Sequence, residues 1–105
     1  MVIVETRVFT KRVVTLLTDD AYKDLQAFLV QHPDAGDVIP GTGGLRKVRW
    51  AVKGRGKRGG ARAIYYWAVN EHTLLMLFIF AKNEQDDLSE DQKRILAKIV
   101  KEEYP

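Results

Sequence analysis

Apolar and polar residues alternate at the start of the chain and again in its middle. Residues 2–9 alternate with a period of two, and residues 45–52 do the same. This period is typical of a β-strand, because successive side chains point to opposite faces of a sheet. Residues 61–69 are rich in the aromatic and β-branched side chains that strands favour. Residues 73–82 are apolar on both faces, which predicts a central strand covered on both sides.

Three other segments carry apolar residues at the spacing of a helix. Thr10 offers a cap for a short first helix, and Thr18 offers a cap for a second helix that ends at Pro33. Ser89 begins a capping-box sequence for a final helix. Residues 33–44 are rich in glycine and proline and are expected to form a loop. The order β-α-α-β-β-β-α predicts an α+β domain with a mainly antiparallel four-stranded sheet.

Length and composition limit the architecture further. The chain has 105 residues, 46% of them hydrophobic, which suits one core but not two ordinary domains. We therefore predict a single domain over residues 1–105. The absence of cysteine excludes disulfides, thiolate zinc sites and thiol catalysis. The longest apolar run, residues 74–81, is far shorter than the ~20 residues of a membrane-spanning helix, so we expect a soluble cytoplasmic protein without a membrane partner.

Positive charge is concentrated in one part of the chain. No acidic residue lies between Asp37 and Glu71, although the net charge of the whole chain is only +3. That interval holds eight of the 17 cationic residues, namely Arg46, Lys47, Arg49, Lys53, Arg55, Lys57, Arg58 and Arg62. A field of one sign attracts polyanions, above all a phosphate backbone.

Residues 54–59 read Gly-Arg-Gly-Lys-Arg-Gly and match the pattern G-x-G-x-x-G. A dinucleotide fingerprint requires these glycines to open a helix, whereas a predicted strand follows them here, so a hairpin loop fits better. A solvated loop tip is the simplest alternative. Cations that continue into the flanking strands at Lys47, Arg49 and Arg62 favour polyanion binding instead. Tyr66 is a candidate for base stacking, with core packing as its alternative.

This composition suits RNA cleavage without a metal or a pair of histidines. The nucleophile is then the 2'-hydroxyl of the RNA itself, so the protein supplies orientation, charge stabilisation and proton transfer. Arginine and lysine can provide the first two of these directly. His32 and His72 are expected at the surface. Asp86 and Asp87 lack a third acidic ligand in the sequence pattern, so we predict neither a metal site nor a cofactor.

Three stretches together resemble the RelE/HigB superfamily of toxins from type II toxin-antitoxin systems, most closely the HigB-type branch. They are residues 36–49 (GDVIPGTGGLRKVR), 53–66 (KGRGKRGGARAIYY) and 80–84 (FAKNE). The resemblance implies a RelE-like fold and an endoribonuclease, or mRNA interferase. Such a toxin enters the ribosomal A site, cleaves mRNA there without a metal, and is held inactive by a cognate antitoxin.

The resemblance also implies residue roles. Lys53 and Arg55 match the loop cations assigned to proton abstraction and phosphate contact, and Lys57 matches the next basic position. Arg62 matches the strand arginine that stabilises the transition state, and Lys82 lies where relatives keep further active-site residues. The basic surface adds Arg46, Lys47, Arg49, Arg58 and Tyr66 as candidate RNA-binding residues.

One departure from the family pattern affects the chemistry. Asn83 stands where RelE-like sequences often place an arginine, which leaves Lys82 and Tyr66 as candidates for the general acid. Two other functions stay open at this point. One is a ParE-like toxin that inhibits DNA gyrase on the same fold, and the other is a non-catalytic module that binds RNA or the ribosome.

Overall fold

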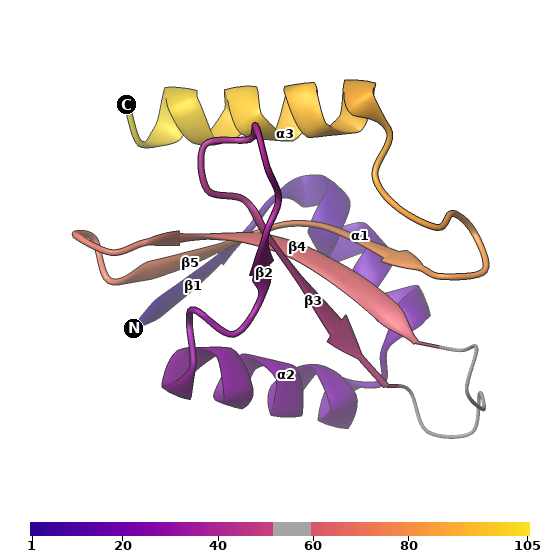
Figure 1. Cartoon of the computed structure of the whole chain (residues 1–105). Coiled ribbons are helices and arrows are strands. Elements are labelled where there is room, and N and C mark those ends of the chain that lie inside the picture. The colour runs from indigo at the N-terminus through magenta and orange to yellow at the C-terminus, as the bar shows by residue number, and fades with distance from the viewer. Residues whose placement is uncertain (52–59) are drawn as a thin grey trace.

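The computed structural model describes residues 1–51 and 60–105, and Figure 1 shows a central sheet between helices. Helices α1 and α2 pack on one face of the sheet, and α3 packs on the other. We call the latter the α3 face. The elements in chain order are β1 (Val2–Glu5), α1 (Arg7–Leu16), α2 (Asp19–Gln31), β2 (Asp37–Val38), β3 (Arg46–Trp50), β4 (Ala61–Ala68), β5 (Thr73–Ala81) and α3 (Glu90–Glu103).

The sheet has five strands in the order β1-β5-β4-β3-β2. Strand β1 runs parallel to β5, and the other three pairings are antiparallel. The α+β class and the mainly antiparallel sheet are therefore confirmed, but the prediction of four strands is wrong. The additional strand β2 lies in the segment expected to be a loop. Its two residues pair with Arg46 and Lys47, and so short a pairing leaves no alternation to read in the sequence.

The first strand is shorter than its alternating pattern suggested. Thr6 ends it, because the Thr6 hydroxyl accepts a hydrogen bond of 3.1 Å from the Phe9 N–H and caps α1. Thr10, the expected cap, lies inside that helix. Phe9 and Val13 are buried on one side of α1. The predicted caps of the other two helices, Thr18 and Ser89, are confirmed.

Strand β5 is buried on both faces, as predicted for a central strand. Its side chains enter two cores. Leu74, Met76 and Ile79 join the core beneath α1 and α2. Leu75, Leu77 and Phe80 join the core beneath α3, together with Ile64, Leu96 and Val100. The adjacent strand β4 pairs with β5 along its whole length, and this register fixes the face to which each of its side chains points.

A buried tyrosine ties the segment before β2 to strand β4. The Tyr65 hydroxyl donates to the carbonyl of Pro33 at 2.7 Å and accepts from the Gly36 N–H at 2.9 Å. Burial raises the pKa of Tyr65. Gly36 approaches the ring so closely that a Cβ there would lie 2.8 Å from Tyr65 Cε1. The contact holds β2 against β3 at the edge of the sheet.

No helix within the described residues has both the length and the apolar character needed to cross a membrane.

Candidate functional site

Arg62 occupies the α3 face of β4, near the end of the strand that adjoins the predicted basic loop. In the sheet register it lies opposite Arg49 of β3 on one side and opposite Phe80 of β5 on the other. Only 8% of Arg62 is exposed, and Phe80 is fully buried. Directly opposed side chains have Cβ atoms about 4.5–5.5 Å apart. Two positively charged side chains therefore lie next to each other on the sheet, and Arg62 is the buried one.

The electrostatic surroundings of Arg62 are unusual for a structural arginine. Among the described residues, no carboxylate lies within 4.0 Å of the Arg62 or Arg49 guanidinium. The intervening residues 52–59 contain no acidic side chain. Burial, and then the neighbouring Arg49, lower the pKa of Arg62. A buried cation normally has a paired acid, because desolvation without one is costly. Here no carboxylate of the described residues compensates the charge, and Arg62 Nη1 donates to the Ala61 carbonyl at 3.3 Å.

Gly60 makes room for the Arg62 guanidinium. A Cβ at Gly60 would lie 3.0 Å from Arg62 Nη1, so the side chain of Arg62 turns back over the start of β4. The Gly60 carbonyl accepts a hydrogen bond of 3.1 Å from the Lys82 N–H. This bond extends the pairing of β4 and β5 by one step and places exposed Lys82 diagonally across from Arg62. Arg49, Arg62 and Lys82 therefore share one end of the sheet.

Lys47 lies on the same face but is already paired. Its Nζ is 3.2 Å from Asp87 Oδ1, in the segment between β5 and α3. Partial burial by itself would raise the pKa of Asp87. The Leu88 N–H and the Lys47 ammonium together lower this pKa by more, so the net shift is downward. One candidate RNA-binding cation is thus neutralised by the domain's own carboxylate.

The fold keeps two other candidates away from Arg62. Arg46 lies opposite Tyr65 and donates from Nη1 to the carbonyls of Asp34 and Gly36, at 3.0 and 2.8 Å. Tyr66 stacks on Tyr104, the C-cap residue of α3, with ring centroids 5.8 Å apart. Both side chains make contacts that stabilise the fold, which favours a structural role over RNA contact.

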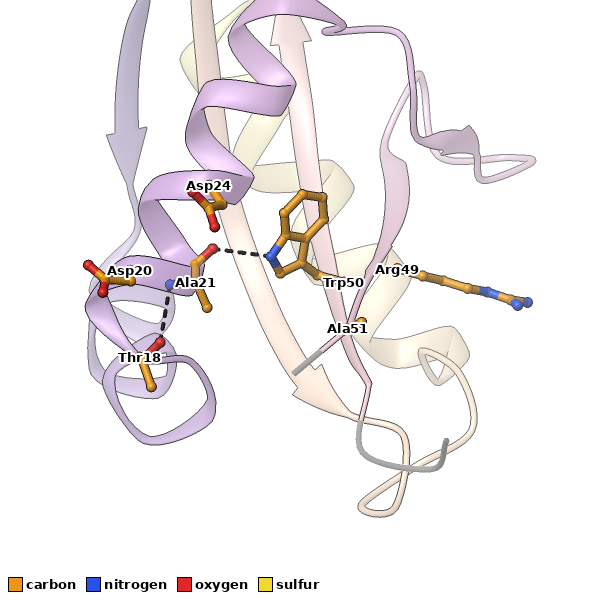
Figure 2. A pocket seen from close by; sticks show the side chains of 7 residues that line it. All are labelled: Thr18, Asp20, Ala21, Asp24, Arg49, Trp50 and Ala51. Carbon is orange, nitrogen blue, oxygen red and sulfur yellow. Dashed lines mark hydrogen bonds between the residues drawn. The ribbon is translucent and has the colours of Figure 1, made fainter. Parts of the chain in front are cut away.

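The two faces of β3 differ, as its alternating sequence indicated. Figure 2 shows Trp50 pointing toward α2 and Arg49 pointing the opposite way. The Trp50 indole N–H donates to the Ala21 carbonyl at 3.1 Å. A hollow on this side is lined in part by Asp20 and Asp24, whose negative charge opposes phosphate binding, and Arg49 also contributes to its lining. The Arg49 side chain nevertheless points away from Trp50, and in the sheet it lies opposite Arg62.

The remaining predicted cations, Lys53, Arg55, Lys57 and Arg58, lie outside the described residues. Among the described residues, no three potential metal ligands of the histidine, aspartate or glutamate type gather in one place. Sequence reasoning missed the roles of Gly60 and Asp87. Neither residue carries a local sequence signal. Gly60 matters because its missing side chain leaves space for the Arg62 guanidinium, and Asp87 matters because it pairs with Lys47, 40 residues earlier in the chain.

Comparison with known proteins defines the class. The sequence model for a family described as the RelE toxin of the RelE/RelB toxin-antitoxin system matches residues 6–104. A chain of the intact Escherichia coli RelBE toxin-antitoxin complex has 13% identity and a TM-score of 0.59, covering 76% of this chain and 94% of that one. A free-state double arginine mutant of E. coli toxin RelE has 18% identity and a TM-score of 0.61, covering 90% and 96% respectively.

The fold is therefore that of the RelE toxins. Because the family match covers nearly the whole chain, the protein belongs to the RelE toxin family of toxin-antitoxin systems. The resemblance seen in the sequence is confirmed at this level. Its placement in the HigB-type branch stays a prediction.

Proposed function

We propose that this toxin is an endoribonuclease that cleaves mRNA in the ribosomal A site. The observation that carries the proposal is buried Arg62, which lies opposite Arg49 in the sheet and has no carboxylate partner among the described residues. Like charges placed directly opposite each other destabilise a sheet. A purely structural strand pair gains nothing from this arrangement, whereas a bound phosphate would neutralise both cations.

The proposed reaction uses the RNA's own hydroxyl. The 2'-oxygen forms a bond to the adjacent phosphorus, its proton passes to a base, and the bond to the 5'-oxygen breaks as that oxygen gains a proton. The products are a 2',3'-cyclic phosphate and a 5'-hydroxyl end. Arg62 and Arg49 stabilise the charge that builds on the phosphorane oxygens. Lys82, at the same end of the sheet, is the better placed of the two candidate general acids, because Tyr66 is stacked on Tyr104.

The family resemblance assigns the remaining roles to the loop. Lys53 and Arg55 would take part in proton abstraction and phosphate contact, and Lys57 would supply a further cation. Crowding by like charges lowers the pKa of a lysine and moves it toward the role of a base. Arg58 would add a contact to the RNA backbone. The reaction needs no metal or cofactor for these steps.

Three partners follow from the proposal. A cognate antitoxin is supported by family membership and by the RelBE complex of similar fold. The ribosome and mRNA are the proposed targets, which places the toxin in the cytoplasm. An acidic segment of the antitoxin would complement the basic cluster.

The proposal is tested by mapping RNA ends in cells after the toxin is induced. Wild type should produce new 5'-hydroxyl ends within translated codons, and Arg62→Ala should remove them together with growth inhibition. We expect Arg62→Ala to lower the rate by on the order of 10²–10³-fold, the usual loss when a group that stabilises an oxyanion is removed. Lys98→Ala is the matched control, because Lys98 is an exposed cation on α3 that pairs with Glu102.

Other outcomes identify the alternatives. Ribosome association without new 5'-hydroxyl ends would indicate a non-catalytic binding module. Loss of gyrase supercoiling activity with the purified toxin would indicate a ParE-like inhibitor. Full toxicity of Arg62→Ala would remove the basis for this site.

A further inference from the structure

The turn after β5, which carries Lys82, is held by hydrogen bonds on both sides. The peptide group that joins Ala81 to Lys82 donates its N–H to the Gly60 carbonyl at 3.1 Å. Its carbonyl accepts from the Glu84 N–H at 3.0 Å. The Ala81 N–H in turn donates to Glu84 Oε1 at 2.8 Å. The backbone around Lys82 is therefore fixed, although its side chain is exposed.

Arg12 of α1 holds the Glu84 carboxylate in place. Arg12 Nη2 donates to Glu84 Oε1 at 2.7 Å, and Arg12 Nε donates to the Ile79 carbonyl at 2.7 Å. The same guanidinium lies over the ring of Phe78, 5.0 Å from its centroid. Helix α1 and the turn are thus joined through one arginine that contacts three points along β5 and its end.

The sheet topology explains why side chains, and not a neighbouring strand, bond the backbone at the end of β5. Strand β1 pairs with β5 only as far as Glu5 and Met76, so the outer edge of β5 has no strand partner beyond that point. The Thr6 hydroxyl donates to the Leu77 carbonyl at 2.8 Å, Arg12 satisfies Ile79, and Glu84 satisfies Ala81. These contacts complete an edge that would otherwise be open.

An ordinary surface ion pair contributes little to stability. The pair of Arg12 and Glu84 differs, because both side chains also bond backbone groups, namely the Ile79 carbonyl and the Ala81 N–H. The Ala81 N–H, and then Arg12, lower the pKa of Glu84, so its carboxylate is charged at neutral pH. Removing that carboxylate would leave the Ala81 N–H without this acceptor, and Arg12 would bond only the Ile79 carbonyl. The turn would then lose its link to α1 through Arg12 and keep its backbone bonds to Gly60 and Ala81.

We propose that Arg12 and Glu84 are positioning residues, which hold the turn so that Lys82 faces the phosphate bound at Arg62. The inference rests on the proposed ribonuclease function and adds two residues that do not touch the RNA. Their effect on the reaction passes through Lys82.

A double-mutant cycle tests this coupling with single-turnover cleavage of ribosome-bound mRNA. Glu84→Ala should slow cleavage by about 10- to 100-fold, because small misplacements of a reacting group have costs of this size. The toxin concentration at which the cleavage rate is half-maximal should stay unchanged. In a Lys82→Ala background, Glu84→Ala should have no further effect. Glu84→Gln, which keeps an oxygen to accept from Ala81, should restore most of the rate.

Glu102→Ala is the control, because it removes a more exposed carboxylate from an ion pair on α3. Its rate should equal that of the wild type. Additive losses in Glu84→Ala and Lys82→Ala, or a fully active Lys82→Ala, would overturn the inference. A loss in Glu84→Ala that tracks the unfolded fraction in a thermal melt would overturn it as well.

A measurement without RNA separates this inference from the proposed function. Hydrogen exchange at the Ala81 and Lys82 amides should accelerate in Glu84→Ala and stay unchanged in Glu102→Ala. If wild type cleaves no mRNA, the ribonuclease proposal fails, and the exchange rates still show whether Glu84 holds the turn. Unchanged exchange in Glu84→Ala would contradict the positioning role even if the toxin is a ribonuclease.

Discussion

At the scale of single residues, the site depends on which cations have an acidic partner. Lys47 is paired with Asp87, whereas Arg49 and Arg62 have no carboxylate within 4.0 Å among the described residues. The sequence shows all three as members of one basic run. Their difference arises from the fold, because Asp87 approaches from a segment 40 residues further along the chain.

Removing the Asp87 charge should free Lys47 for a further phosphate contact. We predict that Asp87→Asn tightens binding of a single-stranded RNA in which 2'-O-methylation blocks cleavage. The slope of log affinity against log salt should steepen by about 1, the change expected for one added phosphate contact. Fluorescence anisotropy at several NaCl concentrations measures both quantities.

Glu102→Gln is the control for net charge, because it removes the same charge from an exposed ion pair with Lys98 on α3. If both variants tighten binding equally, the effect is one of net charge and Lys47 gains no contact. Weaker binding in Asp87→Asn would show that Asp87 helps to position the RNA.

At the scale of elements, capping and periodicity predicted the helices well, and the edges of the sheet poorly. The caps at Thr18 and Ser89 precede clear helical stripes and are found where predicted. Thr6 was missed because Phe9 fits both a continued strand and the buried side of a helix. The pairing of β2 was missed because two residues carry no period. The Thr6 hydroxyl also donates to the Leu77 carbonyl, and β2 exists only through its pairing with β3, so both features depend on contacts with distant residues.

The contact between Tyr65 and the segment before β2 gives an element-scale prediction. Tyr65→Phe removes the hydroxyl that Gly36 and Pro33 contact and leaves the buried Gly36 N–H without its acceptor. We expect the free energy of unfolding to fall by about 1–3 kcal/mol, as measured by urea denaturation.

The control is Tyr104→Phe, a hydroxyl deletion at the end of α3, which should change the stability by less than about 0.5 kcal/mol. A Tyr65→Phe variant as stable as wild type would contradict the structural importance of this hydroxyl.

At the scale of the whole molecule, two ion pairs join segments that are distant in sequence. Arg12 with Glu84 connects α1 to the turn after β5, and Lys47 with Asp87 connects β3 to the segment before α3. In both cases the pKa of the carboxyl group is lower than its ordinary value. The stability that they contribute is therefore fully present above the pKa of the unfolded chain, about 4. It is lost as the pH falls through the lower pKa of the folded state.

We predict that the double variant Glu84→Gln, Asp87→Asn loses stability at neutral pH and shows a flatter fall in melting temperature below about pH 4. Melting followed by circular dichroism between pH 2 and pH 7 would measure this, with Glu90→Gln, Glu102→Gln as the control. If the melting temperature falls with pH equally steeply in wild type and in the Glu84→Gln, Asp87→Asn variant, the lowered pKa values of Glu84 and Asp87 are contradicted.

The sequence alone predicted the fold class and the central strand, and the catalytic role that the resemblance gives to Arg62 stays a prediction. The sequence did not predict which face of β4 is covered by α3, because alternation gives two faces without saying which one is buried. Arg46 and Tyr66 were grouped with Arg62 as part of one basic surface, whereas Arg46 bonds the segment before β2 and Tyr66 stacks on Tyr104. The family resemblance supplied what the local pattern could not, namely the expected chemistry of the basic cluster.

The most direct test of the account is single-turnover cleavage of an mRNA held on purified ribosomes, with wild type, Arg62→Ala and Lys98→Ala compared. We predict rapid cutting in the A-site codon by wild type and Lys98→Ala, with 2',3'-cyclic phosphate and 5'-hydroxyl ends. Arg62→Ala should be slower by on the order of 10²–10³-fold while still folded. Equal rates for folded wild type and Arg62→Ala would contradict the claim that the unpaired guanidinium stabilises the reacting phosphate.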